Sequence, residues 1–348
     1  MKPVISTRVS FYSSLSRVQP DSSMVNVIFY DQGLLKVPGF KKWMKHFDLL
    51  VPLKAGEALK SAPALETTIK KLFDSRVPFI EGRTRFYAVG GGTVGDFVGF
   101  LASTFLQGVD LIHVPTTWVS AMDSAHGGRT ALNAAGVKNI LSTFYPAMEA
   151  WIIEDFFRKQ KGERLQEALG EAAKMALLDE AVWKASGSGA KKPLPWTPQR
   201  LWKLLPVIIE SKLRVVRKDP LGTKGSRIAL ALGQTLGHAL ESKHGLPHGR
   251  AIGVGLFFAL WVSWCEGLLQ SDQFFAIEHA LTENWGLSLS KLSALRLERD
   301  EAATYILRDK KAIASGEIQF TGLRGVGLPE SLIIPIDDLL DHLDGMWS

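Results

Sequence analysis

The stretch RFYAVGGGTVGD, Arg85–Asp96, decides the fold class of this 348-residue chain. Its first five residues have the apolar and aromatic composition of a buried strand, and three glycines follow at once. Glycines directly after a strand let the backbone approach a pyrophosphate, and the next helix offers unpaired N–H groups to its charge. The spacing is not GxGxxG, so this turn predicts nucleotide binding only together with its surroundings.

Strand and helix patterns alternate on both sides of this turn. Strands are predicted at Val25–Tyr30, Asp48–Val51, Arg85–Val89 and Asp110–Val114, and a helix over Glu57–Asp74. Thr116 and Thr117 follow the last of these strands, so two hydroxyls lie at the carboxyl end of a strand, where α/β sheets bind ligands. We therefore predict an α/β nucleotide-binding domain over residues 1–160.

Long helical periodicities dominate the chain after about residue 160. Helices are predicted over Arg164–Asp179, Pro198–Arg217, Ile228–Lys243, Ala251–Leu269 and Asp272–Trp285, and a strand-like run at Ile318–Leu323. A Gly/Pro-rich loop, Ser186–Pro198, separates two of the helices. The second domain, over residues 161–348, is thus predicted to be mostly α-helical and to carry metal and substrate sites.

Composition and charge narrow the class of protein. An apolar share of 46% with 22% charged residues is typical of globular domains, and a net charge of +6 without a block of Lys and Arg argues against nucleic acid. The single cysteine, Cys265, excludes an internal disulfide and fits a cytoplasmic location. The apolar run Ala251–Cys265 is shorter than the roughly 20 residues of a membrane span. No secretory signal is evident at the N-terminus, and we expect no membrane partner.

Two groups of polar residues in the chain are ambiguous on their own. Asp123, Gly127–Thr130 and Lys138–Asn139 form a dense set of charged, amide and glycine residues, which indicates either a ligand site or a solvated loop. Glu171 and Lys174 are three residues apart and share a helix face, a spacing that ordinarily gives a surface salt bridge.

Polar residues within one apolar helical stretch point more clearly to a site. Arg227, Gln234, His238 and Glu241 interrupt the apolar stretch RIALALGQTLGHALE, and burying them costs free energy unless each has a partner. His248 follows ten residues after His238. His and Glu side chains from separate helices are suitable ligands for a divalent metal, although a capping or core role for a single histidine stays open.

Eight segments, taken in order, resemble the 3-dehydroquinate synthase family of sugar phosphate cyclases. They are Ala55–Lys60, Gly90–Phe100, His113–Asn133, Gly136–Asn139, Glu167–Lys174, Leu230–Glu241, Pro247–Gly255 and Arg308–Phe320. The resemblance runs from about residue 25 to residue 330. It implies an α/β NAD-binding domain followed by a helical domain that holds zinc or cobalt.

The resemblance also implies roles for individual residues. It gives NAD binding to Gly56, Glu57, Lys60, Gly91, Gly92, Thr93, Val94, Gly95, Asp96, Thr116, Thr117 and Lys138. It places Asp123, Arg129, Asn139, Lys174, Lys212, Arg227, His238 and one of Lys310 or Lys311 in the active site, and makes Glu171, Gln234 and His248 the metal ligands. Lys212 and Arg227 would hold the substrate carboxylate, and His238 would lie near the leaving phosphate.

The implied reaction converts a small anionic substrate, 3-deoxy-arabino-heptulosonate 7-phosphate, to 3-dehydroquinate. NAD oxidises a hydroxyl transiently, phosphate leaves, the ketone is reduced, and ring opening with an aldol step forms the carbocycle. A homodimer is also implied.

Several positions depart from the pattern of the family. Gln234 stands where the family has a metal-binding His, and an amide oxygen should bind zinc more weakly than imidazole. Ala231, Gln107, Arg129 and Thr223 also replace residues usual in the family, two of which contact phosphate. A cyclase of changed substrate and a non-catalytic NAD-binding homologue therefore remain alternatives, with a metal-dependent polyol dehydrogenase as a distant one.

Overall fold

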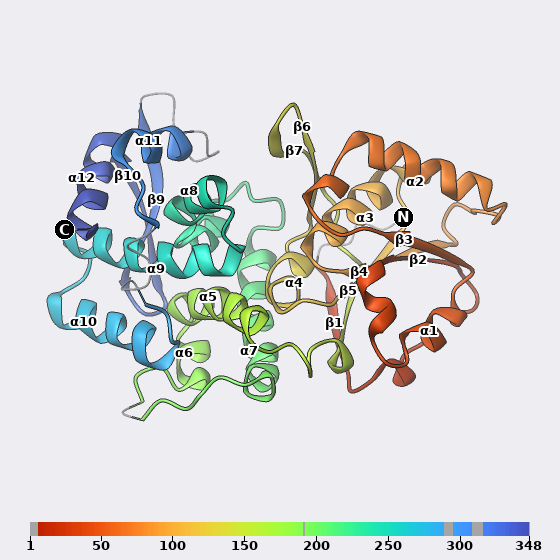
Figure 1. Ribbon diagram of the computed structural model, residues 1–348, viewed down its shortest axis with the longest axis horizontal. Coiled ribbons are helices and arrows are strands. Elements are labelled where there is room, and N and C mark those ends of the chain that lie inside the picture. The colour runs from red at the N-terminus through yellow and green to blue at the C-terminus, as the bar shows by residue number, and fades with distance from the viewer. Residues whose placement is uncertain (1–5, 191, 289–294, 308–315, 348) are drawn as a thin grey trace. The chain divides into compact units, whose positions relative to one another are not determined.

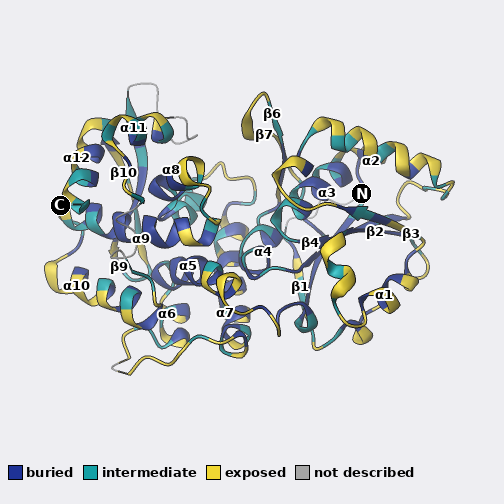
Figure 2. Ribbon diagram, in the orientation of Figure 1, coloured by how far each residue is buried: buried dark blue, intermediate teal, exposed yellow. Residues whose placement is uncertain are grey.

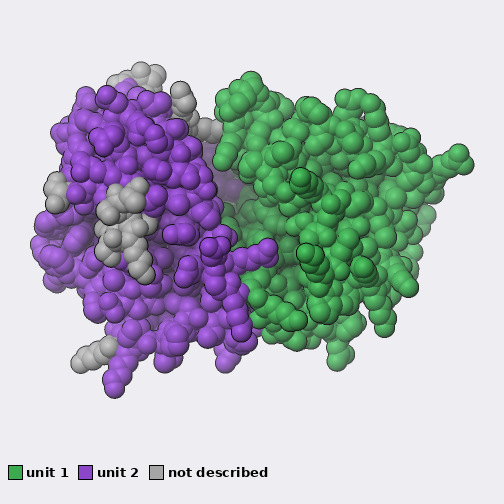
Figure 3. All heavy atoms as spheres, in the orientation of Figure 1, with its two compact units in different colours: residues 1–160, 212–221 green, residues 161–211, 222–348 purple. Residues whose placement is uncertain are grey.

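The computed structural model describes residues 6–190, 192–288, 295–307 and 316–347. The chain forms two compact units, coloured separately in Figure 3. The first contains residues 1–160 and also Lys212–Leu221 from much later in the sequence. The second contains residues 161–211 and 222–348.

The first unit is built on a six-stranded sheet in the order β1-β8-β5-β4-β2-β3. The strands are β1 (Arg8–Tyr12), β2 (Val25–Asp31), β3 (Leu49–Leu53), β4 (Thr84–Gly90), β5 (Asp110–Pro115) and β8 (Glu149–Ile153). Every neighbouring pair is parallel. The central strands read as continuous apolar runs because they are buried on both faces (Figure 2). The predicted α/β fold class is confirmed.

Helices and one hairpin complete the first unit (Figure 1). They are α1 (Phe40–Trp43), α2 (Ala62–Asp74), α3 (Gly92–Thr104), α4 (Trp118–Met122) and the antiparallel hairpin of β6 (Arg129–Ala134) and β7 (Val137–Phe144). The helix predicted over Glu57–Asp74 is divided into a 3₁₀ turn, Glu57–Leu59, and α2. Pro63 explains where α2 starts, since proline suits the first turn of a helix and not its interior.

The second unit is mostly helical, as predicted. It contains α5 (Glu163–Leu178), α6 (Glu180–Ser186), α7 (Pro198–Lys218, of which the last seven residues belong to the first unit), α8 (Gln234–His244), α9 (His248–Cys265), α10 (Ser271–His279), α11 (Arg299–Leu307), α12 (Ile336–Trp347) and the antiparallel strands β9 (Glu317–Gly325) and β10 (Leu328–Pro335).

Helix α9 is the core of the second unit and packs against α5, α8 and β9. Its apolar run is buried almost throughout, which confirms a core helix at this position. Within the described part of the chain, no helix is long and apolar enough to cross a membrane.

The helix predicted over Ile228–Lys243 is wrong in one respect, because the chain breaks within it. A 3₁₀ segment, Ser226–Ala231, ends before Gly233, whose φ of 74° lies in the left-handed region, and α8 begins at the next residue. The carbonyl of Gly233 lies so close to α9 that a Cβ on Gly255 would overlap it. Arg227 therefore does not share a helix with the polar side chains of α8.

Candidate active site

The glycine turn after β4 leaves space in front of the N-terminus of α3. Gly91 caps the helix, and a Cβ added to Gly92 would have only the hydroxyl of Ser124 within 4 Å, at 3.5 Å. A thirteen-residue helix carries a partial positive charge at this end, and its first N–H groups have no partner within the helix. The turn therefore offers both room and hydrogen-bond donors to a phosphate group.

Lys60 links the glycine turn to the β6–β7 hairpin. Its ammonium donates to the carboxylate of Asp96 at 2.6 Å and to the side-chain oxygen of Asn139. Burial raises the pKa of Asp96, while the charge of Lys60 lowers it. Asn139 has a φ of 56°, which is uncommon for a residue other than glycine and is held here by this bond and by one to Asn133. The structure thus brings together Lys60, Asp96 and Asn139.

Asn133 was not predicted as a site residue, although it connects several that were. Its amide donates to Glu57 at 2.9 Å, its oxygen accepts from the backbone N–H of Asn139, and its own N–H donates to the carbonyl of Lys60. An asparagine directly before a hairpin turn is the only signal in the sequence. Gly56 joins the same region through its N–H, which donates to the hydroxyl of Thr93.

The two threonines after β5 lie beside the glycine turn. The N–H of Thr116 donates to the carbonyl of Gly90 at 2.9 Å, and the hydroxyl of Thr117 caps α4 in a capping box with Ser120. Thr117 also lies 3.3 Å from the position of a Cβ on Gly91. The carboxyl ends of β4 and β5 therefore form one edge, as the sequence predicted.

Asp123 pairs with Lys212, which is 4% exposed and belongs to the first unit. Arg129 and Lys138 lie instead at exposed positions of the β6–β7 hairpin, and the guanidinium of Arg129 lies over the ring of Phe144 at 5.5 Å. These two cations are not part of the hydrogen-bonded group of Lys60, Asp96 and Asn139. Lys310 and Lys311 lie outside the described residues.

In the second unit, close backbone packing brings α5 against α9. A Cβ on Gly170 would overlap the carbonyl oxygen of Gly249, and a Cβ on Gly249 would overlap that of Glu167. Only glycine permits this approach, and it delivers Glu171 to His248, with 2.9 Å between Oε1 and Nε2.

Glu171 is also paired with Lys174 at 2.6 Å, and the two side chains are 1% and 0% exposed. The ordinary reading of this spacing as a surface salt bridge is therefore wrong.

The other ring nitrogen of His248 faces α8. Nδ1 lies 3.1 Å from Oε1 of Glu241, and the ring centroid lies 6.1 Å from that of His238. Burial disfavours charge on His248, but hydrogen bonds to Glu171 and Glu241 raise its pKa to about 10. His238, Glu241 and His248 offer ligand atoms that all lie within 4.8 Å of one another. Gln234 begins α8, one turn before His238.

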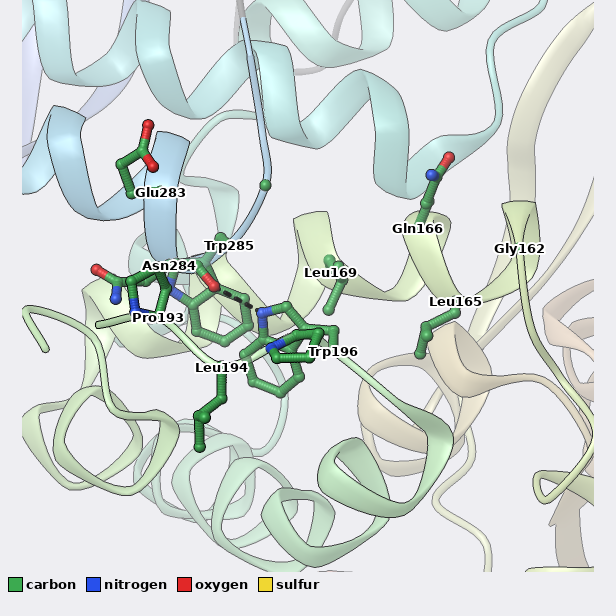
Figure 4. Close-up of a pocket in the computed structure, with 12 residues that line it drawn as sticks. Gly162, Leu165, Gln166, Leu169, Pro193, Leu194, Trp196, Glu283, Asn284 and Trp285 are labelled. Carbon is green, nitrogen blue, oxygen red and sulfur yellow. Dashed lines mark hydrogen bonds between the residues drawn. The ribbon is translucent and has the colours of Figure 1, made fainter. Parts of the chain in front are cut away.

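A pocket of about 490 Å³ lies elsewhere in the second unit, and none of these residues lines it (Figure 4). Trp196 and Trp285 stack there at 4.6 Å, and the indole N–H of Trp196 donates to the carbonyl of Asn284 at 2.8 Å. This pocket was not predicted from the sequence.

Known proteins share this architecture. A solved 2-deoxy-scyllo-inosose synthase, complexed with carbaglucose-6-phosphate, NAD⁺ and Co²⁺, superposes with a TM-score of 0.82 at 20% identity, covering 97% of this chain and 96% of that one. The 2-epi-5-epi-valiolone synthase of Streptomyces hygroscopicus, with NAD⁺ and Zn²⁺ bound, gives 0.78 at 20% identity, covering 99% and 98%. The fold is thus that of the sugar phosphate cyclases.

Sequence comparison identifies the family within that class. The model described as 3-dehydroquinate synthase N-terminal matches residues 50–167, and that described as 3-dehydroquinate synthase C-terminal matches residues 168–312. The 3-dehydroquinate synthase of Sulfolobus acidocaldarius is 32% identical over 90% of this chain and 88% of the relative. That of Saccharolobus solfataricus is 35% identical over 76% and 72%. The chain belongs to the 3-dehydroquinate synthase family, whose members are phosphate-eliminating lyases.

Proposed function

We propose that this chain is a working 3-dehydroquinate synthase that uses NAD and a divalent metal. Its substrate would be 3-deoxy-arabino-heptulosonate 7-phosphate, and its products 3-dehydroquinate and phosphate. The observation that carries the proposal is the array Lys174–Glu171–His248–Glu241 in a chain of this family. An imidazole beside a carboxylate supplies donors that suit a divalent cation, and the carboxylate on the other ring nitrogen orients the imidazole.

The first unit is suited to NAD. The open space at Gly92 and the N-terminus of α3 fit a pyrophosphate, and Glu57, Lys60 and Asp96 supply charged and polar groups beside it. When bound, NAD would accept a hydride from the substrate and return it within the same turnover. We propose that the remaining predicted NAD contacts, including Thr116, Thr117 and Lys138, also bind NAD.

The second unit is suited to a divalent metal. Glu171, Gln234 and His248 are the ligands that the resemblance implies, and a metal there would polarise the oxygens of the substrate. Lys174 is fully buried against Glu171, which positions an ammonium at the edge of this site. The resemblance implies that His238 lies near the leaving phosphate and that Lys212 and Arg227 hold the carboxylate, a role that suits Arg227 because a guanidinium binds a carboxylate through two parallel hydrogen bonds.

A cyclase of changed substrate is the second candidate. Gln107, Ala231 and Thr223 replace residues usual in the family, so the phosphate contacts differ. Leu106 and Gln107 both have positive φ values, 47° and 63°, a strained conformation that is found more often at functional positions. The relatives at 32% and 35% identity favour the synthase over a polyol dehydrogenase.

The deciding experiment measures phosphate release from purified protein with NAD, zinc or cobalt, and the seven-carbon sugar-acid phosphate. We expect phosphate and 3-dehydroquinate in equal amounts, and much less of both from Lys212→Met. Turnover of an uncarboxylated seven-carbon sugar phosphate alone would support the changed-substrate candidate. If neither substrate releases phosphate while NAD still binds, the chain is a non-catalytic homologue.

A homodimer and a cytoplasmic location complete the proposal. Family membership supports the homodimer, and the free thiol of Cys265 supports the cytoplasmic location.

A further inference from the structure

His248 lies between two different sets of donors. Its Nε2 faces Glu171 on α5, and its Nδ1 faces Glu241 on α8. The two lone-pair directions of an imidazole diverge, so one metal ion binds one nitrogen only, and the other nitrogen is left to a hydrogen bond. The choice of nitrogen therefore decides which residues are ligands and which residue only orients the ring.

The Nε2 side offers a weak set in this chain. Gln234, which the resemblance makes a ligand on this side, is a neutral amide. The charge of Glu171 is already balanced by Lys174 at 2.6 Å, and both side chains are buried at 1% and 0% exposure. Lys174 contacts Oε2 of Glu171 and His248 contacts Oε1, so both would compete with a metal for this carboxylate.

The Nδ1 side offers the carboxylate of Glu241, and His238 lies on the same helix as that carboxylate. His238 and Glu241 are three residues apart on α8 and therefore project from one helix face, a spacing of His and Glu that helical metal sites use. Their ligand atoms and that of His248 lie within 4.8 Å of one another. Zn–N and Zn–O bonds are about 2.0–2.2 Å, so small rotations of these side chains would close the site.

This side is also accessible. Glu241 is 20% exposed and His248 is 32% exposed, in contrast to Glu171. A substrate oxygen can therefore reach a metal held here.

We propose that His238, Glu241 and Nδ1 of His248 bind the metal in this chain, and that Glu171 is a positioning residue. Glu171 accepts the N–H of Nε2, which fixes the tautomer that presents Nδ1 to the metal. The metal site is thereby displaced by one turn of α8 from the position of Gln234. The proposal rests on the proposed function only in taking the ion to be the divalent metal of that reaction.

The test is zinc affinity, measured by competition titration without substrate and supported by the visible spectrum of the cobalt form. Gln234→Ala and His238→Ala form a matched pair, because they lie one turn apart on α8 and neither is part of the Glu241–His248 contact. We expect Gln234→Ala to bind zinc as the parent does. His238→Ala and Glu241→Gln should each weaken binding by more than the roughly 100-fold that changes to orienting residues cause.

Two results overturn the proposal. One is a loss of affinity in Gln234→Ala equal to that in His238→Ala, and the other is unchanged affinity in both His238→Ala and Glu241→Gln. The melting temperature of each metal-free variant shows whether it folds, and His238→Asn replaces His238→Ala if that variant does not. Because no substrate is present, a protein that binds zinc as proposed and releases no phosphate contradicts the proposed function alone.

Discussion

At the scale of single residues, Lys60 shows what the sequence could and could not predict. Lys60, Asp96 and Asn139 were each expected in a site on the strength of the resemblance. That one buried ammonium bonds both of the others was not foreseeable, because Asn139 is 79 positions away and reaches Lys60 only through its left-handed backbone. Glu241 was noticed as a polar residue in an apolar stretch, but its contact with His248 required the packing of two helices.

Gly92→Val should abolish NAD binding and leave the fold intact. A valine side chain would occupy the space that a pyrophosphate needs, while the nearest atom of the protein to its Cβ is the Ser124 hydroxyl at 3.5 Å. Titration calorimetry with NAD measures the effect, and the melting temperature without NAD serves as control. Unchanged affinity would show that the nucleotide binds elsewhere.

His126 should make the protein sensitive to acid. Burial lowers its pKa to about 4, although Nε2 bonds the carbonyl of Ala121 at 2.7 Å. The unfolded imidazole has a pKa of about 6.5, so between pH 6.5 and 4 the unfolded chain binds a proton that the folded chain does not. The free energy of unfolding therefore falls as the pH decreases through this window, by up to about 3 kcal/mol for this group.

His126→Gln keeps a donor for the Ala121 carbonyl and removes the titrating group. Its melting temperature should fall less than that of the parent between pH 6.5 and 4.5, with a residual decline because burial also lowers the pKa of His113 to about 4. His46 is exposed, and His46→Gln should behave as the parent does. Parallel pH curves for all three proteins would contradict this account.

At the scale of elements, the packing of α9 determines whether the metal donors meet. The strands β2, β3, β4, β5 and β9 and the helices α2, α5, α7, α9 and α10 were predicted from hydrophobic periodicity, because a buried strand and an amphipathic helix carry strong local patterns. Strands β1, β8 and β10, the β6–β7 hairpin and the helices α1, α4, α6, α11 and α12 were missed. A periodicity is hard to recognise in elements as short as α1 or α4. The break at Gly233 could not be predicted, because the contact with Gly255 that requires it is made across two elements.

Gly249→Ala should weaken both the fold and metal binding. The new Cβ would overlap the carbonyl oxygen of Glu167, so α5 and α9 must separate, at a cost on the order of 1–3 kcal/mol. The separation also moves Glu171 away from His248. Differential scanning fluorimetry and zinc titration measure the two effects.

Gly253→Ala on the same helix is the matched control. Its nearest neighbour is a methyl group of Leu287 at 3.3 Å, which can move, and alanine favours a helix over glycine by about 1 kcal/mol. Stability and metal affinity should therefore be retained. Equal losses in the two variants would show that the Gly249 contact has no special role.

At the scale of the whole molecule, the grouping of residues was harder to predict than their local structure. The change from strand-rich to helical patterns placed a boundary near residue 160. Nothing in the periodicity of α7 showed that Lys212–Leu221 would group with the first unit, and this is the segment that brings Lys212 to Asp123. Such an assignment depends on long-range contacts, which one sequence does not display.

The assembly is predicted to be a homodimer. Sedimentation equilibrium should give a mass near twice the 38.3 kDa of one chain. Val137, Ile140 and Leu141 on β7 are exposed apolar side chains, which association over this strand would remove from water. A mass near 38.3 kDa at micromolar concentration would refute the prediction.

The glycine contacts of α9 affect how this gene would change if selection for its chemistry were relaxed. Gly170, Gly233, Gly249 and Gly255 carry no functional group, yet a methyl at three of them would meet backbone at once and at Gly233 would meet a strained φ. Substitutions there impair folding. Selection would remove them from any gene whose product must still fold, even if that product no longer catalysed a reaction. Donors such as His238 lie at partly exposed positions and could be lost without harm to the fold. Intact glycines in a descendant would therefore report only that it folds, and the donors would report whether it still works.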